Sequence, residues 1–475
     1  MTLEEFKSTL VHQYHLVCCV DLADINQSHS AIYKIFDRHY KEVFDPTERL
    51  VFYSSGQPSD QLLAHIQHAA RVLDISDWFI MVCAPHVVDS KPLLPDQLLD
   101  KNTLCPLPWM HLAVMNQGEV KACCVYKNII GSVIDTNLET IFHGKHMKQL
   151  RQSLLQGDQP TGCEHCWNLE QHQITSNRQQ HADFYAQKFY TNWIDNPQIR
   201  SVDFRPGNVC NFKCRICMPE ASSLVASERL KISTDPIEIQ NLKNINGQWF
   251  DQDDQFIKQM LALLPQLVNI DLYGGEPFLL KQLPKFLKQA VESGHASHIR
   301  LHFNTNGSMF PTAMIPYLTQ FRQVDISISI DNVGDRFEFE RGGNWSIVEQ
   351  NIAQFNAVQN FNISIMPTIN IQNVFYIGDL VAWADQTQNR IVFNYLDWPA
   401  YLSIDHLTPL GKQLVIDRYK NHPHSELQKI VKRVQHSIGS DGTKFVSYMK
   451  QLDQHRKENF SDSHQEIAHA MGYSV

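Results

Sequence analysis

Short apolar runs alternate with amphipathic segments along most of this chain. After about residue 200 they recur as strand-then-helix units, a pattern typical of a parallel sheet. In the helix expected between the second and third strands, Leu283, Phe286 and Leu287 fall on one face, and Gly294 ends the pattern. The six strands that we expect span residues 201–205, 267–273, 299–304, 324–330, 361–368 and 390–396. Such units predict an α/β fold with an incomplete TIM-type barrel, a partial (β/α)6 arrangement within residues 201–401.

The two ends of the chain have simpler patterns. Residues 1–84 contain three apolar runs of strand length and one helical repeat, which predict a small α/β domain of unknown role. Residues 85–104 carry three prolines and are expected to be a linker. Residues 402–475 are expected to be helical and to cover an open edge of the barrel rather than carry chemistry.

Residues 105–170 differ from both flanking regions. His111–Val114 and Val120–Cys123 are separated by a polar turn that ends in Gly118, which predicts a β-hairpin followed by a helix. Residues 171–200 are polar and aromatic, and we expect a connecting helix there.

Composition narrows the class of protein. The chain has 475 residues, 43% hydrophobic and 19% charged, which is ordinary for a globular protein. A formal net charge of −9 argues against a nucleic-acid-binding protein, and no apolar run is long enough to span a bilayer. The N-terminus lacks the pattern of a signal peptide, so we expect a cytoplasmic protein without a membrane partner. In that compartment the 11 cysteines indicate metal or catalytic use rather than disulfides.

Three cysteines, Cys210, Cys214 and Cys217, follow the first expected barrel strand with the spacing C-x3-C-x2-C. Thiolates are the soft ligands that iron–sulfur clusters take. A loop this short supplies three ligands and no fourth, which leaves one iron open to a ligand that is not protein. The alternatives are three unrelated buried thiols and a zinc knuckle, which needs a fourth Cys or His nearby.

A second group of cysteines lies in residues 105–170. Cys163 and Cys166 form a CxxC pair, and Cys105 and Cys123 flank the expected hairpin. Four thiolates suit either zinc or a 4Fe–4S cluster on spacing alone, and in a zinc ribbon His165 is a competing ligand.

The Cys210–Cys217 spacing resembles the signature of the radical S-adenosylmethionine (SAM) superfamily. This resemblance implies a 4Fe–4S cluster whose fourth iron binds SAM. It also implies that the run Gly274, Gly275, Glu276 and Pro277 matches the motif that binds the SAM amino group. By the same resemblance, Ser329 and Arg341 hold the SAM carboxylate and Asp331 shapes that end of the site. Asn306, after the third expected strand, also matches the family, and Asn373, after the fifth, is a weaker candidate.

Residues 105–170 resemble the twitch module, a short form of the SPASM domain that binds an auxiliary 4Fe–4S cluster. The matching ligands are Cys105, Cys123, Cys163 and Cys166, and Cys124 is left out because neighbouring strand residues face opposite sides. Two features depart from the family pattern. The module precedes the barrel instead of following it, and Ile216 replaces the aromatic residue that often packs against the adenine.

The resemblance implies an enzyme that cleaves SAM reductively to a 5′-deoxyadenosyl radical and abstracts a substrate hydrogen. We expect oxidative modification of a peptide side chain, with a flavodoxin- or ferredoxin-type reductant and with the catalytic residues unassigned. The alternative substrates are a small alcohol, a sugar or a nucleoside. The alternative from another class is a zinc-binding scaffold with a non-catalytic barrel.

Overall fold

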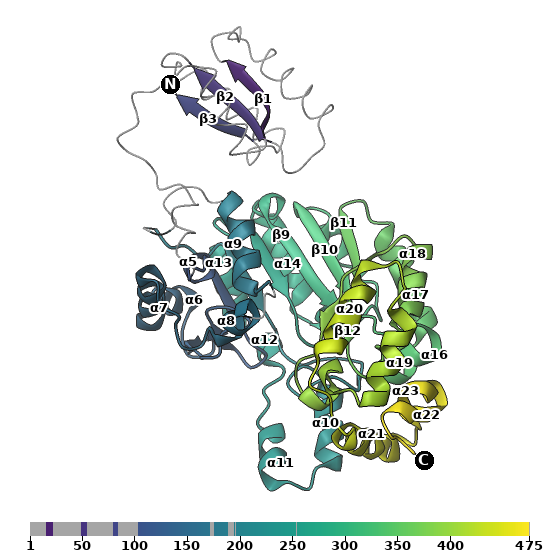
Figure 1. Cartoon of the computed structure of the whole chain (residues 1–475). Helices are drawn as coiled ribbons and strands as arrows, with labels where there is room; N and C mark the ends of the chain where they lie inside the picture. Colours follow the sequence, from purple (N-terminus) through teal and green to yellow (C-terminus); the bar gives the residue numbers. More distant parts are fainter. Residues whose placement is uncertain are drawn as a thin grey trace. The chain divides into compact units, whose positions relative to one another are not determined.

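The computed structural model describes residues 16–21, 49–54, 79–83, 103–171, 175–188, 194, 196–252 and 254–474 (Figure 1). The chain divides into two compact units. One comprises Met1–Pro106 and Asn177–Trp193, and the other comprises Leu107–Ser176 and Ile194–Val475.

The first unit contains a three-stranded parallel sheet in the order β1-β2-β3. Its strands are β1 (Leu16–Asp21), β2 (Arg49–Ser54) and β3 (Phe79–Cys83), which coincide with the three apolar runs. The same unit includes α9 (Asn177–Lys188), a helix within the expected connecting segment. The helix expected between β2 and β3, and residues 85–102 of the expected linker, lie outside the described residues.

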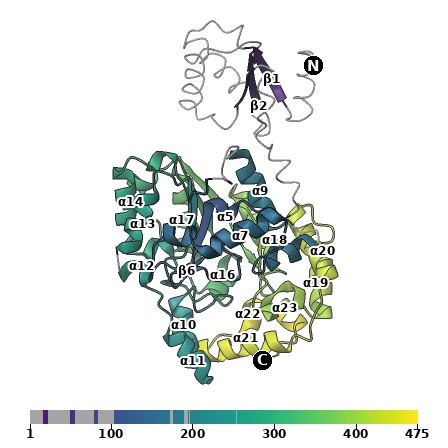
Figure 2. The ribbon, with the colours of Figure 1, turned by 90° about the vertical axis from the view of Figure 1, so that its left-hand side faces the viewer.

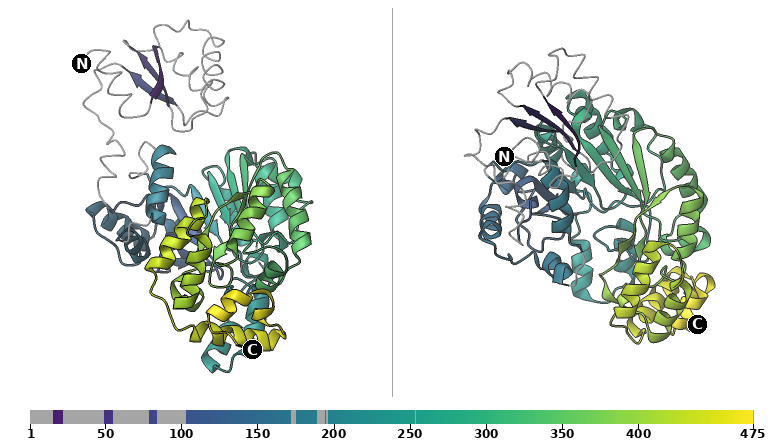
Figure 3. Two further views of the ribbon diagram at one scale, coloured as in Figure 1. Left: turned by 45° about the vertical axis from the view of Figure 1, so that its right-hand side comes forward. Right: turned by 45° about the horizontal axis from the view of Figure 1, so that its top comes forward.

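The second unit is built on a nine-stranded sheet in the order β13-β11-β10-β9-β8-β7-β4-β5-β6 (Figure 3). Six of its strands are those of the expected barrel: β7 (Ser201–Phe204), β8 (Asn269–Leu272), β9 (Arg300–Thr305), β10 (Gln323–Ile328), β11 (Phe361–Ile365) and β13 (Arg390–Ile391). All six occupy runs that the sequence predicts. Their parallel pairing confirms the expected partial barrel. A separate parallel pair joins β12 (Thr368–Ile369) to β14 (Asn394–Tyr395).

The expected hairpin is present as β4 (His111–Val114) and β5 (Glu119–Lys121), extended by β6 (Gly131–Ser132). It is not a separate layer. β4 pairs in parallel with β7, in the register His111 to Ser201 and Val114 to Phe204. The hairpin therefore continues the barrel sheet at the strand that leads into the cysteine loop.

Helices follow the hairpin and the strands. After the hairpin come α6 (Leu138–Phe142), α7 (Lys145–Gln156) and α8 (Glu164–Gln171), with the short α5 (Leu107–Met110) before it. Between barrel strands lie α10 (Ser223–Ile232), α11 (Pro236–Lys243), α12 (Trp249–Gln252), α13 (Gln255–Leu263), α14 (Leu283–Glu292), α15 (Ile315–Leu318), α16 (Gly334–Arg341), α17 (Trp345–Asn356) and α18 (Ile377–Gln386). Short 3-10 turns, η2 (Pro277–Leu279), η3 (Ala296–His298), η4 (Ala400–Leu402) and η5 (Ile404–His406), connect them.

The barrel strands have one apolar face and one polar face. On β7 the apolar side chains Val202 and Phe204 are buried, and Phe204 packs against Phe250 and Phe256 with ring centroids 5.7 and 5.3 Å apart. The alternate positions, such as Asp203 and Asp271, are polar and point to the opposite face. A closed TIM barrel fills its interior with branched apolar side chains. The polar inner face of this open sheet therefore distinguishes it from a closed barrel.

The C-terminal region is helical, as expected: α19 (Pro409–Tyr419), α20 (Ser425–His436), α21 (Thr443–Arg456), α22 (Phe460–Ser463) and α23 (Gln465–Ala470). Figures 1 and 2 both show α21 beside α10. None of the helices that the structure describes combines the length and the apolar character needed to cross a bilayer.

Candidate functional site

The three cysteines of the loop after β7 lie together. Burial raises the pKa of the Cys214 thiol to about 11, and Cys210 contributes to this rise. Burial also raises the pKa of Cys217, which both other thiols raise further. Cys210 Sγ accepts hydrogen bonds from Phe212 N at 3.4 Å and from Asn306 Nδ2 at 3.8 Å. Across the described residues, no three His, Cys, Asp or Glu side chains converge on a position for a single metal ion.

Arg341 faces these thiols from the C-terminal end of α16. Its Nη1 donates to Asp331 Oδ2 at 2.6 Å, while Asp331 Oδ1 accepts from Thr368 N at 2.8 Å. Burial lowers the pKa of Arg341, but Cys214 and Asp331 outweigh it and hold the pKa above its usual value. Arg341 Nε is buried and has no hydrogen-bond partner in the described structure. The guanidinium thus keeps one donor available beside the cysteine loop.

The turn Gly274–Pro277 after β8 packs directly on the cysteine loop. Gly275 has φ +49°, and a Cβ there would lie 2.4 Å from the carbonyl oxygen of Val209. The backbone of Glu276 donates to the same oxygen at 2.7 Å. Glycine is therefore required here because two stretches of backbone meet, and not only because a ligand approaches.

The Glu276 side chain is buried and bonded by the protein. Thr305 Oγ1 lies within hydrogen-bond distance of both carboxylate oxygens, at 2.8 and 2.9 Å, while Asn306 N donates to Oε2 at 2.7 Å and Phe278 N to Oε1 at 3.2 Å. Burial raises the pKa of Glu276 to about 7. These contacts fasten the end of β8 to the end of β9, a role that the sequence does not indicate.

The remaining SAM-site candidates lie at neighbouring strand ends. Asn306 Nδ2 donates to Asn211 Oδ1 at 2.9 Å as well as to Cys210 Sγ. Ser329 follows β10 and its backbone nitrogen donates to Thr305 O at 2.8 Å. Asn373 is different, because its side chain bonds within its own turn, to Thr368 O and Asn370 N at 2.9 Å each.

Three of the four predicted auxiliary ligands belong to the second unit. Lys127 N donates to Gly162 O at 2.9 Å, which joins the loop after Cys123 to the segment that carries Cys163 and Cys166. Both Cys123 and Cys163 raise the pKa of Tyr126, after the larger effect of its burial. The competing candidate His165 is exposed. Cys105 belongs to the other compact unit, and the structure does not relate its position to these three.

Two comparisons with protein families identify these features. Residues 204–383 match the model of the radical SAM superfamily, and residues 105–167 match that of the SPASM iron–sulfur cluster-binding domain. The chain therefore contains a radical SAM domain and, before it, a SPASM-type domain. These two domains imply S-adenosylmethionine, a SAM-binding 4Fe–4S cluster and an auxiliary 4Fe–4S cluster as cofactors.

Several solved structures are similar to parts of this radical SAM chain. One is native anSMEcpe with bound AdoMet and a Kp18Cys peptide, with 17% identity over 46% of this chain and 59% of that chain, at a TM-score of 0.34. Another is Streptococcus suis SuiB bound to its precursor peptide SuiA, with 14% identity over 67% of this chain and 62% of that chain, at a TM-score of 0.31. The match covers less than two thirds of either solved chain.

The residues present fit the cofactors of this family. Three thiols on one loop supply the donor set for a cluster with one open iron. The free Arg341 Nε beside them suits a carboxylate, because a guanidinium binds carboxylates through directed N–H groups.

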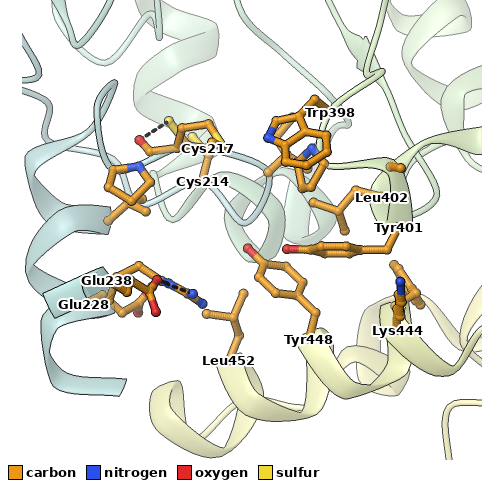
Figure 4. A pocket seen from close by; sticks show the side chains of 18 of the residues that line it. Cys214, Cys217, Glu228, Glu238, Trp398, Tyr401, Leu402, Lys444, Tyr448 and Leu452 are labelled. Carbon is orange, nitrogen blue, oxygen red and sulfur yellow. Dashed lines mark hydrogen bonds and ion pairs between the residues drawn. The ribbon is translucent and has the colours of Figure 1, made fainter. Parts of the chain in front are cut away.

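A pocket of about 1140 Å³ borders the cysteine loop at Cys214, Ile216 and Cys217 (Figure 4). Its opposite wall includes Tyr401 and Tyr448, whose hydroxyl groups point toward each other. Pockets for small ligands commonly measure roughly 300–1,000 Å³, so this space is ample for one organic molecule. Of the residues expected around SAM, it includes Ile216, whereas Glu276, Ser329 and Arg341 do not line it.

The C-terminal helix α21 holds the cysteine loop from outside the barrel. Arg215, between the second and third cysteines, is fully buried and pairs with Asp453, and its guanidinium lies 3.7 Å from the Phe339 ring centroid. Tyr448 donates to the Arg215 carbonyl oxygen, and Arg456 Nη2 donates to the Lys213 carbonyl oxygen at 2.8 Å. No sequence pattern indicated these residues, and the one signal that could have suggested them is an arginine inside the cysteine motif. The expectation that the tail only covers the barrel edge is therefore incomplete.

Proposed function

We propose that this protein is a radical SAM enzyme that oxidatively modifies a peptide side chain. The observation that supports the chemistry best is the group formed by three clustered thiols and the buried Arg341, whose Nε is free beside them. The radical SAM domain supports an enzyme, and the free Nε of Arg341 suits the SAM carboxylate.

In this proposal Cys210, Cys214 and Cys217 hold the SAM-binding cluster, and Cys105, Cys123, Cys163 and Cys166 hold the auxiliary cluster. When bound, SAM and its reduced cluster supply a 5′-deoxyadenosyl radical that removes a hydrogen atom from the substrate. An iron–sulfur cluster is a one-electron carrier, and a second one favours a net two-electron oxidation. A flavodoxin- or ferredoxin-type protein is the proposed reductant.

The protein's own groups orient SAM. Arg341 binds the carboxylate through Nε while Asp331 fixes the guanidinium plane. Ser329 lies at the end of the adjacent strand β10 and offers a hydroxyl to the same carboxylate. Gly274, Gly275 and Pro277 shape the turn on the cysteine loop, and Asn306 orients Cys210.

Glu276 is the proposed acceptor for the SAM ammonium group. Thr305 Oγ1 lies within hydrogen-bond distance of both oxygens but has one hydrogen to donate, so three donor groups serve the four acceptor sites of the carboxylate. One acceptor site is therefore left for the ammonium group when the Thr305 hydroxyl donates to a single oxygen.

The test is anaerobic reconstitution followed by metal analysis and mass spectrometry of 5′-deoxyadenosine. We expect about eight irons per chain, four for each cluster, and formation of 5′-deoxyadenosine with dithionite as reductant.

Arg341→Lys should weaken SAM binding about tenfold, because lysine cannot reproduce the planar fork. Arg336→Lys, on the same helix but paired with Asp379 at 2.9 Å, is the matched control and should leave SAM binding unchanged. Zinc without sulfide, or no SAM cleavage at full iron content, would refute the proposal.

A further inference from the structure

The backbone of the cysteine loop is held from outside by its carbonyl groups. Three carbonyl oxygens each accept a hydrogen bond from a side chain outside the loop: Phe212 O from Ser222 Oγ at 2.7 Å, Lys213 O from Arg456 Nη2 at 2.8 Å, and Arg215 O from Tyr448 Oη. Tyr448 and Arg456 belong to α21, and Ser222 caps the N-terminus of α10. These carbonyls therefore point away from the loop, toward the two helices that flank it.

The N–H groups of the same three peptide groups have no such partner. They belong to Lys213, Cys214 and Ile216, and none of them donates to another residue among those that the structure describes. All three peptide groups are trans. In a planar trans peptide the N–H and C=O bonds point in opposite directions. Each N–H is thus directed away from the side chain that holds its carbonyl.

The cysteine thiols lie on the other side of the loop from Tyr448. Burial raises the pKa of all three thiols, and Arg341 opposes that rise in each. Arg341 and Cys210 do not line the pocket into which Tyr448 projects (Figure 4). Loop amides already serve sulfur on the thiol side, because Phe212 N donates to Cys210 Sγ at 3.4 Å and the N–H of Cys214 lowers the pKa of its own thiol.

Amide N–H groups beside an iron–sulfur cluster affect its reduction potential. A cluster on thiolate ligands is an anion, and successive backbone N–H groups form concave sites that favour anions. Hydrogen bonds to the sulfurs are among the factors that set the potential of a cluster. Reduction adds one negative charge, so an N–H donor stabilises the reduced state more than the oxidised state and raises the potential.

Of the three side chains that hold the carbonyls, Tyr448 has the simplest set of contacts. Ser222 also caps α10, and Arg456 also pairs with Glu228. Among the described residues, the Tyr448 hydroxyl makes a single hydrogen bond, the one to Arg215 O. Removal of this hydroxyl therefore tests the hold on the loop without the loss of a second bond.

We propose that Tyr448 is a positioning residue for the SAM-binding cluster. By holding the Arg215 carbonyl, it aims the Ile216 N–H at a cluster sulfur and raises the reduction potential of that cluster. Tyr448 acts through the backbone and touches neither SAM nor a cysteine thiol. This inference rests on the proposed function and deepens it, because it gives the C-terminal helix α21 a part in the reduction of the cluster.

The experiment is a redox titration of the reconstituted full-length protein, followed by electron paramagnetic resonance (EPR). A parallel sample with SAM identifies the signal of the SAM-binding cluster, because SAM changes that signal and not the signal of the auxiliary cluster. Tyr448→Phe keeps the ring and removes only the hydroxyl. We expect the equilibrium constant for reduction of the SAM-binding cluster to fall about tenfold. For a one-electron couple this is a decrease of about 59 mV in potential.

Tyr401→Phe is the matched control. The Tyr401 ring lies 5.2 Å from the Tyr448 ring in the same pocket, and no hydrogen bond joins the Tyr401 hydroxyl to the cysteine loop in the described structure. This variant should leave the potential unchanged. Iron and sulfide content, together with dialysis against labelled SAM, establish that each variant is folded and loaded.

A second measurement tests the N–H group directly. In wild-type protein labelled with ¹⁵N-isoleucine, pulsed EPR should show coupling between the SAM-binding cluster and the Ile216 nitrogen, and Tyr448→Phe should weaken it. The inference is overturned if the wild type shows no coupling, if Tyr448→Phe leaves the potential unchanged, or if Tyr401→Phe shifts it equally. If Tyr448→Phe does not take up its clusters, the coupling in the wild type decides alone. Failure to form 5′-deoxyadenosine, with a potential that still depends on Tyr448, would instead refute the proposed chemistry and leave the positioning role standing.

Discussion

Arg215 Nη2 lies 2.6 Å from Asp453 Oδ1, which joins the centre of the cysteine loop to helix α21 near the C-terminus. The Arg215 side chain is completely buried, and Glu458 pairs with the same nitrogen. A long-range ion pair of this kind ties the geometry of the proposed cluster site to the last helices of the chain.

Replacement of Arg215 by leucine should lower the free energy of unfolding by about 3–5 kcal/mol, because Asp453 would keep a buried charge without its partner. Urea denaturation of the cluster-free protein measures this effect. Arg418→Leu is the control. Arg418 also pairs with an aspartate and stacks on a ring, Phe375, but it is 37% exposed, so a loss below about 1 kcal/mol is expected. Equal losses in the two variants would contradict the assigned role of burial.

Gly275→Ala should disturb the cysteine loop. The new Cβ would lie 2.4 Å from Val209 O, so the turn or the loop must shift, at a cost of about 1–3 kcal/mol in stability. SAM affinity should fall as well, since the loop carries the cluster ligands. Gly294→Ala is the control, because its φ of +78° gives similar backbone strain in open space. If SAM affinity and stability change equally in both variants, contact with Val209 is not the reason for glycine at 275.

The adjacent cysteines Cys123 and Cys124 should behave differently. Cys124 is partly buried and interacts electrostatically with Asp203 and Asp271, whereas Cys123 interacts with Tyr126, as Cys163 does. Cys123→Ala should reduce iron to about four per chain, and Cys124→Ala should leave about eight. Iron and sulfide analysis after anaerobic reconstitution makes the comparison. The reverse pattern would exchange the assignments of these two thiols.

The pH dependence of stability should carry a contribution from Asp203. Burial raises its pKa from 3.8 to about 7, an effect that Asp271 increases and Arg205 opposes. Because the folded-state pKa is above the unfolded one, the protonated form stabilises the fold. This contribution is complete below about pH 4 and is lost as pH rises through about 7.

Asp203→Asn should remove that contribution. The free energy of unfolding of the variant should match that of the wild type near pH 4 and exceed it near pH 8 by roughly 1–3 kcal/mol. Asp325→Asn is a useful comparison because Asp325 pairs with Arg300, and it should not gain stability at high pH. A pH profile of unfolding that is the same for Asp203→Asn and the wild type would contradict an ionisable, buried Asp203.

The sequence predicted the strands of the barrel because each strand is a short run of apolar residues. Such a run is a local property of the sequence, visible without knowledge of the fold. It also predicted that Cys210, Cys214 and Cys217 lie together, because they share one short loop. The pairing of Arg215 with Glu458 joins residues 243 positions apart, and no local pattern encodes such a partner. The parallel pairing of β4 with β7 was missed for the same reason, since the hairpin looked complete by itself.

Glu276 shows a different limit. Its motif indicated a ligand contact, but the side chain also fastens Thr305 and Asn306, and only the three-dimensional arrangement reveals those hydrogen bonds. Asn373 was a reasonable candidate by position, yet its amide closes its own turn. A residue type at a strand end thus predicts the region of the fold in which the side chain lies better than it predicts the atoms that the side chain bonds.

The pairing of β4 with β7 also has a consequence for synthesis. His111 leaves the ribosome before Ser201, its partner in the sheet, and the interval of 90 positions corresponds to roughly 5–20 s of translation. During that time one edge of the nascent hairpin has no strand beside it, and such an edge is a template for wrong association. Slower elongation through the intervening stretch should therefore lower the yield of correctly assembled protein.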